Sequence, residues 1–266
     1  MQPDAGMGRV FLVGAGPGPA DLLTVRALRA IESAQALLYD ALVSDEVLAL
    51  APRGCTCIQT GKRAGHASMA QATINQLMLR LARRGLAVVR LKGGDPSVFG
   101  RSGEEVDFLN ARGVPVEIVP GVTAACAAAA QFRFPLTHRG VARQVVFATA
   151  RTQDDGAIHL ARSADDPETT LALYMARDSI QPLFQRLIAN GRAAHTPAAA
   201  IESAGSVDAR FFTGDLLTLP ATLRAAAPEG PVLVVVGDVA AMASDAFACK
   251  AHAPDLMAAR ALTAGG

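Results

Sequence analysis

Short runs of apolar residues alternate with amphipathic stretches over the first half of the chain. Apolar and β-branched runs that end in glycine or a polar residue predict strands, and apolar positions that recur every three or four residues predict helices. This pattern predicts strands at residues 9–13, 36–39, 56–59, 87–91 and 116–119. Because helical stretches separate these strands, the sequence predicts a mostly parallel sheet with helices on its faces.

Polar residues mark the expected starts of two of these helices. Asp21 is placed to cap a helix over residues 22–31, and Ser44 is placed to cap a short helix that follows the second strand. Further helices are predicted at residues 74–81, 103–111 and 122–131.

The pattern changes at residues 132–142, which contain a proline and no clear period. We place a domain boundary there, which gives an N-terminal α/β domain of residues 1–138 and a C-terminal α/β domain of residues 139–266. In the second domain, strands are predicted at residues 144–149, 169–175, 197–202, 207–213 and 231–236, with helices at 180–188 and 216–226. The strands at 197–202 and 207–213 flank a short turn, which favours a hairpin.

Composition narrows the possible functions. The chain has 266 residues, of which 51% are hydrophobic, and its net charge of +1 gives no electrostatic case for a nucleic-acid or membrane-surface partner. No apolar run is long enough for a transmembrane helix, and the N-terminus does not resemble a signal peptide. The 4 cysteines are scattered, so we expect neither a disulfide framework nor a metal site, and we expect a cytoplasmic protein.

The stretch VVRLKGGDPSVFGRSGEE is the strongest candidate for a binding site. A strand ends there in Gly93-Gly94-Asp95, and a second glycine-rich turn leads into a helix. Adjacent glycines let the backbone approach a ligand closely, and open α/β sheets bind small molecules where such strands end.

An earlier loop, GAGPG after the first strand, leaves a different function open. It suggests a nicotinamide- or flavin-dependent oxidoreductase, with Asp40 at the end of the second strand as a ribose partner. The dinucleotide fingerprint needs a third glycine at position 19, where this chain has Pro19.

The chain also carries, in this order, the motifs VFLVGAGPGPADLLT, LLYDALVS, TGKRAG, VVRLKGGDPSVFGRSGEE, VPGVTAACAAAA, FPLTHRGVA and TLALYM. Their order and spacing resemble those of the uroporphyrinogen-III C-methyltransferases, within the tetrapyrrole methylase superfamily. The resemblance implies two α/β domains of the tetrapyrrole methylase type with the cofactor cleft between them, and a homodimer. It implies transfer of methyl groups from S-adenosyl-L-methionine to rings A and B of uroporphyrinogen III. The products are S-adenosyl-L-homocysteine and precorrin-2, which feeds sirohaem, cobalamin or haem d1 synthesis.

The same resemblance implies roles for particular residues. Asp40 matches the family's proposed proton acceptor, and Lys62 matches its proposed proton donor. The positions that match cofactor contacts are Pro17, Gly93, Gly94, Asp95, Val98, Thr123, Ala124, Met175 and Ala204.

The substrate side is less well defined by the sequence. Uroporphyrinogen carries several carboxylates, and guanidinium groups pair with carboxylates in bidentate fashion, so Arg63 and Arg139 are candidate contacts. One departure from the family pattern is Ala150-Arg151, which stands where Gly-His is usual. Because of that departure, a tetrapyrrole-binding protein without turnover remains an alternative. A methylase for a later precorrin is a further alternative within the superfamily, although the PLTHR motif argues against it.

Overall fold

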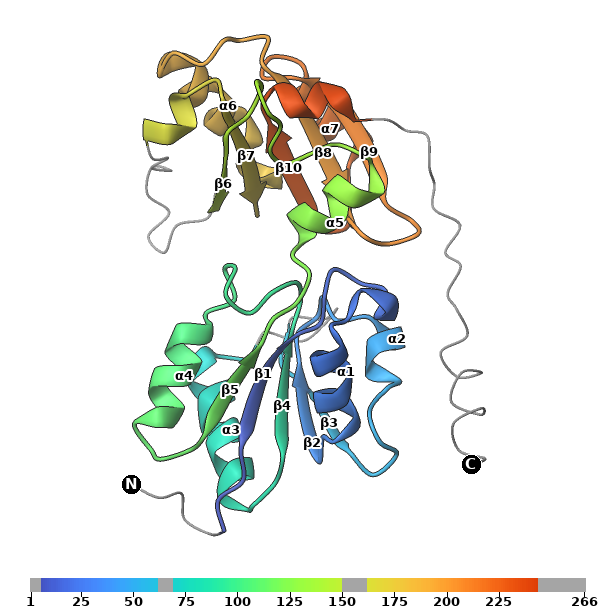
Figure 1. The fold of residues 1–266 in the computed structure, drawn as a ribbon, viewed down its shortest axis with the longest axis vertical. Coiled ribbons are helices and arrows are strands. Elements are labelled where there is room, and N and C mark those ends of the chain that lie inside the picture. The colour runs from blue at the N-terminus through green and yellow to red at the C-terminus, as the bar shows by residue number, and fades with distance from the viewer. Residues whose placement is uncertain (1–5, 62–68, 150–161, 244–266) are drawn as a thin grey trace.

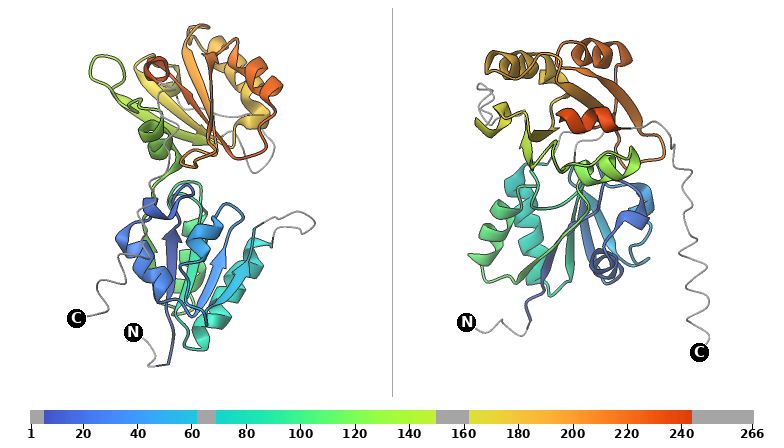
Figure 2. Two further views of the ribbon diagram at one scale, coloured as in Figure 1. Left: turned by 90° about the vertical axis from the view of Figure 1, so that its right-hand side faces the viewer. Right: turned by 45° about the horizontal axis from the view of Figure 1, so that its top comes forward.

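The computed structural model of the chain describes residues 6–61, 69–149 and 162–243. They form two α/β units, each built on a five-stranded sheet, that stand one above the other (Figure 1). Figure 2 shows the same arrangement from two other directions. The predicted α/β fold class is confirmed.

The first sheet is parallel throughout, as predicted. Its order is β3 (Thr56–Gln59), β2 (Ala36–Tyr39), β4 (Val88–Lys92), β1 (Val10–Gly14) and β5 (Val116–Val119). Three of these strands have the predicted bounds, and β1 and β4 begin and end one residue later than predicted. Helices cover both faces of this sheet, so its central strands are apolar on both sides. Such continuous apolar runs are why the strands could be predicted from the sequence.

Helices cover the two faces of this sheet in pairs. Helices α1 (Val25–Glu32) and α2 (Asp45–Leu48) pack on one face, against a cluster that includes Leu37, Val89 and Leu91. Helices α3 (Gln71–Arg83) and α4 (Ser102–Asn110) pack on the other face, against a cluster that includes Leu38 and Val88. Alternate residues of β4 therefore face opposite helix pairs.

Of the two predicted helix caps, one is confirmed and one is wrong. The Ser44 side chain accepts a hydrogen bond from the Val47 amide at the start of α2, which confirms that prediction. The prediction for Asp21 is wrong: Asp21 lies in a 3-10 turn, η1 (Ala20–Leu22), and Thr24 caps α1 by accepting from the Ala27 amide. The chain takes an extended conformation at Thr24, so the helix begins there rather than after Asp21.

The second sheet is mixed. Its order is β6 (Gln144–Thr149), β7 (Thr169–Tyr174), β10 (Val232–Val236), β8 (Pro197–Glu202) and β9 (Arg210–Asp215). Only β6 and β7 run parallel, and β8 and β9 form the predicted antiparallel pair. Helices α6 (Ile180–Ala189) and α7 (Leu219–Ala226) pack with β7, β8 and β10 in one apolar cluster.

Helix α5 (Ala124–Gln131) connects the two units. Its buried Ala125 and Ala128 belong to the same apolar cluster as Ala199 and Val235 of the second sheet. The domain boundary at residues 138 and 139 remains a prediction, and this packing favours a change of unit before α5. None of the described helices is long and apolar enough to cross a membrane.

Candidate functional site

A pocket of about 970 Å³ lies between the two units. Its walls come from the segments that follow β1, β2, β4 and β5 in the first unit, from those that follow β7 and β8 in the second, and from the start of β10. The predicted cofactor residues all line it: Pro17, Gly93, Gly94, Asp95, Val98, Thr123, Ala124, Met175 and Ala204. Asp40, the predicted proton acceptor, lines it as well. The pocket therefore lies at the carboxyl ends of strands, where open α/β sheets bind ligands.

Backbone hydrogen bonds join the two glycine-rich loops of the first unit. The Gly94 amide donates to the Gly16 carbonyl at 2.7 Å, and the Gly16 amide donates back to the Gly94 carbonyl at 3.2 Å. The GAGPG loop and the Gly93-Gly94-Asp95 bend thus form one wall of the pocket. Gly94 has a φ of +69°, which a residue with a side chain adopts at a cost.

Gly14 and Gly121 allow the ends of β1, β4 and β5 to approach one another closely next to this wall of the pocket. A Cβ atom on Gly121 would lie 2.3 Å from the Gly94 carbonyl oxygen and 2.8 Å from the Gly14 Cα. A Cβ atom on Gly14 would lie 2.6 Å from the Gly121 backbone. These contacts are with backbone atoms, so a side chain at either position would force the loops apart.

We therefore expect Gly121→Ala to lower both stability and cofactor binding, although the substitution adds only one methyl group. Overpacking of this kind typically costs about 1–3 kcal/mol of stability and moves the backbone. We expect a lower midpoint of thermal unfolding and weaker binding of S-adenosylhomocysteine, measured by calorimetry. The matched control is Gly103→Ala, because a Cβ there would have no atom within 4 Å. Equal behaviour of the two variants would contradict the account of this junction.

Asp95 organises the bend through both of its carboxylate oxygens. One oxygen accepts from the Gly121 amide at 2.9 Å, and the other accepts from the Ser97 amide at 2.8 Å and from the Ser97 hydroxyl. Partial burial would raise the pKa of Asp95, but the hydrogen bonds from Ser97 and Gly121 outweigh it and hold this pKa below its ordinary value. Asp95 is therefore ionised at neutral pH, and it ties the bend to the turn before α5.

The second unit contributes residues in unusual backbone conformations. Met175 and Ser203 line the pocket with φ values of +55° and +52°, and Phe99 of the first unit does so with +54°. Non-glycine residues in this region are uncommon, and they concentrate at functional sites. Met175 is 49% exposed although it directly follows an apolar strand, so it does not act as a core residue.

Tyr174 connects the pocket wall of the second unit to both α5 and the first unit. Its hydroxyl lies 2.6 Å from the Thr123 hydroxyl and accepts from the Ala125 amide at 3.3 Å. Its ring centroid lies 5.2 Å from that of Phe99. Burial raises the pKa of Tyr174, so it stays a neutral hydrogen-bonding group. Neither Tyr174 nor Phe99 was predicted as a site residue from the sequence.

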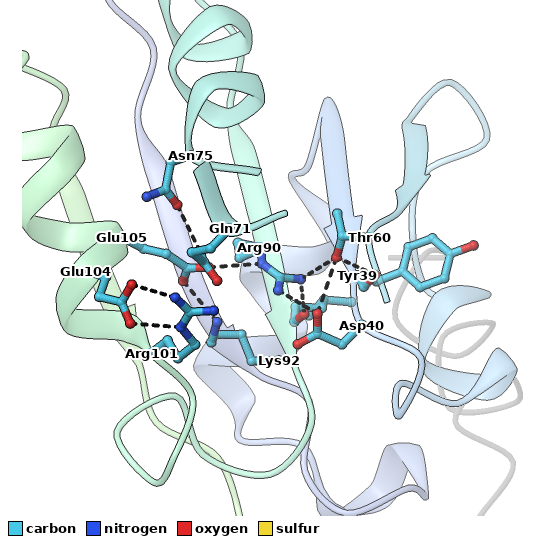
Figure 3. A network of polar contacts seen from close by, with 11 residues as sticks. Tyr39, Asp40, Thr60, Gln71, Asn75, Arg90, Lys92, Arg101, Glu104 and Glu105 are labelled. Atoms are coloured by element: carbon cyan, nitrogen blue, oxygen red, sulfur yellow. Dashed lines mark hydrogen bonds and ion pairs between the residues drawn. The ribbon is translucent and has the colours of Figure 1, made fainter. Parts of the chain in front are cut away.

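Asp40 belongs to a network of charged side chains that Figure 3 shows. The Arg90 guanidinium donates to the Asp40 carboxylate at 2.5 Å and to the Thr60 hydroxyl at 3.1 Å. The same guanidinium donates to Glu105 at 3.3 Å, and Glu105 also accepts from the Lys92 ammonium at 3.0 Å. Two cations and two carboxylates therefore balance one another.

The network is largely removed from water. The side chains of Arg90 and Lys92 are 3% and 4% exposed, and that of Glu105 is 0% exposed, whereas that of Asp40 is 31% exposed. Burial lowers the pKa of Lys92, with a further contribution from the positive Arg90, while Glu105 acts in the opposite direction. Lys92 and Asp40 line the pocket, and they link the network to whatever the pocket binds.

Other predicted residues are not brought to the pocket by the described part of the chain. Lys62 and Arg63 lie outside the described residues, as does the Ala150-Arg151 departure. Arg139 is exposed and is not among the residues that line the pocket, so its contact with substrate remains a prediction. Among the described residues, Lys92 and Arg177 are the cationic side chains in the pocket wall. No cluster of metal-ligating side chains occurs in the ranges that the structure describes.

Comparison with known proteins agrees with this geometry. Residues 9–220 match the sequence profile of the tetrapyrrole (corrin/porphyrin) methylases, which covers well over half of the chain. The chain belongs to the tetrapyrrole methylase family. The resemblance noted in the motifs is thereby confirmed.

Two curated relatives and one crystal structure show which members of the family this chain is similar to. The uroporphyrinogen-III C-methyltransferase of Paracoccus denitrificans is 45% identical over 91% of this chain and 84% of its own length. The chloroplastic S-adenosyl-L-methionine-dependent uroporphyrinogen III methyltransferase of Arabidopsis thaliana is 44% identical over 89% of this chain. The match spans 64% of the Arabidopsis protein's length. The crystal structure of uroporphyrin-III C-methyltransferase from Thermus thermophilus, complexed with S-adenosylhomocysteine, is 38% identical. It has a TM-score of 0.76 and covers 88% of this chain and all of the Thermus chain.

Proposed function

We propose that this tetrapyrrole methylase transfers methyl groups from S-adenosyl-L-methionine to rings A and B of uroporphyrinogen III and so forms precorrin-2. One observation carries the proposal: every residue matched to a cofactor contact by the motifs lies on one pocket between the two units. The relatives named for this activity support the choice of substrate. They do not favour an oxidoreductase, and the GAGPG loop is accounted for by its bonds to the Gly94 bend.

The pocket wall fits a sulfonium-bearing amino acid. Gly93 and Gly94 present backbone without side chains, and Asp95 holds that backbone in place. A Cβ atom on Gly93 would lie 2.9 Å from the side chain of Leu42, which also lines the pocket, so a side chain at position 93 would crowd this part of the wall. Val98, Met175 and Ala204 supply apolar surface from both units. When bound, S-adenosylmethionine supplies the methyl group, and the protein contributes mainly by positioning the two reactants.

Asp40 is placed to accept a proton from the methylated ring. A carbon that gains a methyl group in this chemistry must lose a proton, so a base near the reacting atoms accelerates the reaction. The Asp40 carboxylate is partly exposed to the pocket, and Arg90 fixes one of its oxygens. Lys62 is the proposed proton donor.

The substrate's carboxylates need cationic partners. Arg63 and Arg139 are the proposed contacts from the sequence, and guanidinium groups suit this work because they bind carboxylates through two parallel hydrogen bonds. Arg177 at the pocket wall is exposed enough to join them: its side chain is 42% accessible. Precorrin-2 would then serve sirohaem, cobalamin or haem d1 synthesis.

Assembly and location complete the proposal. The proposed homodimer rests on the motif resemblance. The proposed cytoplasmic location rests on the 4 cysteines of the sequence, which are too few and too scattered for a disulfide framework. Analytical ultracentrifugation would measure the assembly directly.

The decisive experiment uses the whole chain with uroporphyrinogen III and S-adenosylmethionine labelled in its methyl group. We expect two labelled methyl groups in each product molecule. Label transfer that occurs only when a later precorrin replaces uroporphyrinogen III as substrate would favour the alternative methylase. Binding of uroporphyrinogen III without transfer would favour a tetrapyrrole-binding protein.

A further inference from the structure

Glu105 is a buried carboxylate with no role in the site described so far. It lies in α4, its side chain is 0% exposed, and it is not among the residues that line the pocket. Burying an ionised carboxylate is costly unless cations and hydrogen-bond donors surround it. The fold supplies three donors to Glu105, and two of them lead directly to pocket residues.

The first connection runs to Asp40. Glu105 accepts from the Nε atom of Arg90 at 3.3 Å, while a terminal nitrogen of the same guanidinium donates to Asp40. A guanidinium is planar and rigid, so fixing one edge of it fixes the direction of the other edge. Figure 3 shows Glu105 and Asp40 on opposite sides of Arg90. The orientation of Asp40 therefore depends in part on Glu105.

The second connection runs to Lys92. Its ammonium donates to the other oxygen of Glu105 at 3.0 Å, and the Gly93-Gly94-Asp95 bend begins at the next residue. Arg90 and Lys92 are two positions apart on β4 and so point to the same face of the sheet. One carboxylate from α4 can reach both of them for this reason.

The third donor fixes Glu105 itself. The Gln71 side chain donates to Glu105 at 3.0 Å and to Asn75 at 2.9 Å. Glu105 is thus held from α3, from β4 and by its own helix. These donors offset the cost of burying the carboxylate, and they also leave it little freedom to move.

We infer that Glu105 is a positioning residue for methyl transfer: it holds Arg90 so that Arg90 aims Asp40 at the substrate, and it holds Lys92 at the pocket wall. This inference rests on the proposed function, in which Asp40 accepts the proton. Glu105 acts only through Arg90 and Lys92, which relay its position to the pocket.

The test compares Glu105→Gln with Glu104→Gln. Gln keeps the size of the side chain and removes its charge. Glu104 is the matched control because it is the adjacent carboxylate in α4, is 50% exposed, and accepts its hydrogen bonds from Arg101 rather than from Arg90 or Lys92. We expect Glu105→Gln to lower kcat by about a hundredfold, the usual effect of misplacing a reacting group by about 1 Å. We expect Glu104→Gln to leave kcat unchanged.

Cofactor affinity provides a second measurement. Since Asp95 keeps its own partners, affinity for S-adenosylhomocysteine should stay within about threefold of the wild type in both variants.

A double-mutant cycle separates positioning from general damage to the fold. If Glu105 acts through Asp40, Glu105→Gln should have little further effect on the residual turnover of Asp40→Asn. A loss of the same factor in both backgrounds would overturn the inference. If Glu105→Gln does not fold, Gln71→Ala provides the second variant, because it removes one of the three donors to Glu105 without changing any charge. We expect a smaller loss of kcat that likewise disappears in Asp40→Asn.

The outcomes distinguish this inference from the proposed function. Wild-type turnover together with equal kcat values for Glu105→Gln and Glu104→Gln would overturn the role of Glu105 alone. Absence of methyl transfer by the wild-type chain would overturn the proposed function, and the role of Glu105 with it.

Discussion

Replacing Asp95 with alanine is expected to weaken binding of S-adenosylhomocysteine by about a hundredfold or more, since hydrogen bonds to a charged group are each worth about 1.5–3 kcal/mol. The reason is the position of Asp95 between two loops. Its carboxylate accepts from the Gly121 amide and from Ser97, so its loss releases the bend from the turn that precedes α5. Isothermal titration calorimetry measures the affinity directly.

The control for this experiment is Asp107→Ala. Asp107 is exposed on α4 and does not line the pocket, so the variant makes the same chemical change without touching the bend. Both variants should show similar circular dichroism. An unchanged affinity in Asp95→Ala would remove this residue from the cofactor site.

Replacing Asp40 with asparagine is expected to lower kcat by about a hundredfold or more, the usual contribution of a general base. Asn keeps the shape of the side chain but cannot take up the proton. Affinity for S-adenosylhomocysteine should change little, because Asp95 and the glycine bend remain intact. Steady-state turnover with labelled methyl groups, together with calorimetry, separates the two effects.

Asp45→Asn is the matched control for that variant, because Asp45 is an exposed aspartate in the first turn of α2. It should retain the turnover of the wild type. If Asp40→Asn turned over at the wild-type rate, another group would have to accept the proton, and the network around Arg90 would lose its proposed purpose.

Much of the fold was predictable because of where the apolar residues fall. The central strands β1, β2 and β4 of the first unit are almost wholly buried, and their apolar runs end in a glycine or a polar residue that marks where each strand stops. The order of the second sheet was not predictable in this way. The short turn predicted the hairpin of β8 and β9, but nothing in the sequence shows that β10 lies between β7 and β8 and runs antiparallel to both. The cap of α1 was missed because Asp21 and Thr24 are both suitable residues, and only the backbone conformation decides between them.

The site was predictable only in part, for a related reason. Bends such as Gly93-Gly94-Asp95 are local, so the sequence reveals them. The contact between Arg90 and Glu105 is not local, because it depends on how α4 packs over β4. A signal was present: Arg90 and Lys92 are charged residues at alternate positions of an otherwise apolar strand. Such residues must face a buried partner of opposite charge, and the sequence alone does not identify that partner.

The most direct test of the central claim is a crystal structure of this chain with S-adenosylhomocysteine. We predict that the ligand occupies the pocket between the two units, with the backbone of Gly93 and Gly94 on one side and Met175 and Ala204 on the other. A ligand bound elsewhere, with that bend filled by the protein's own side chains, would contradict the account.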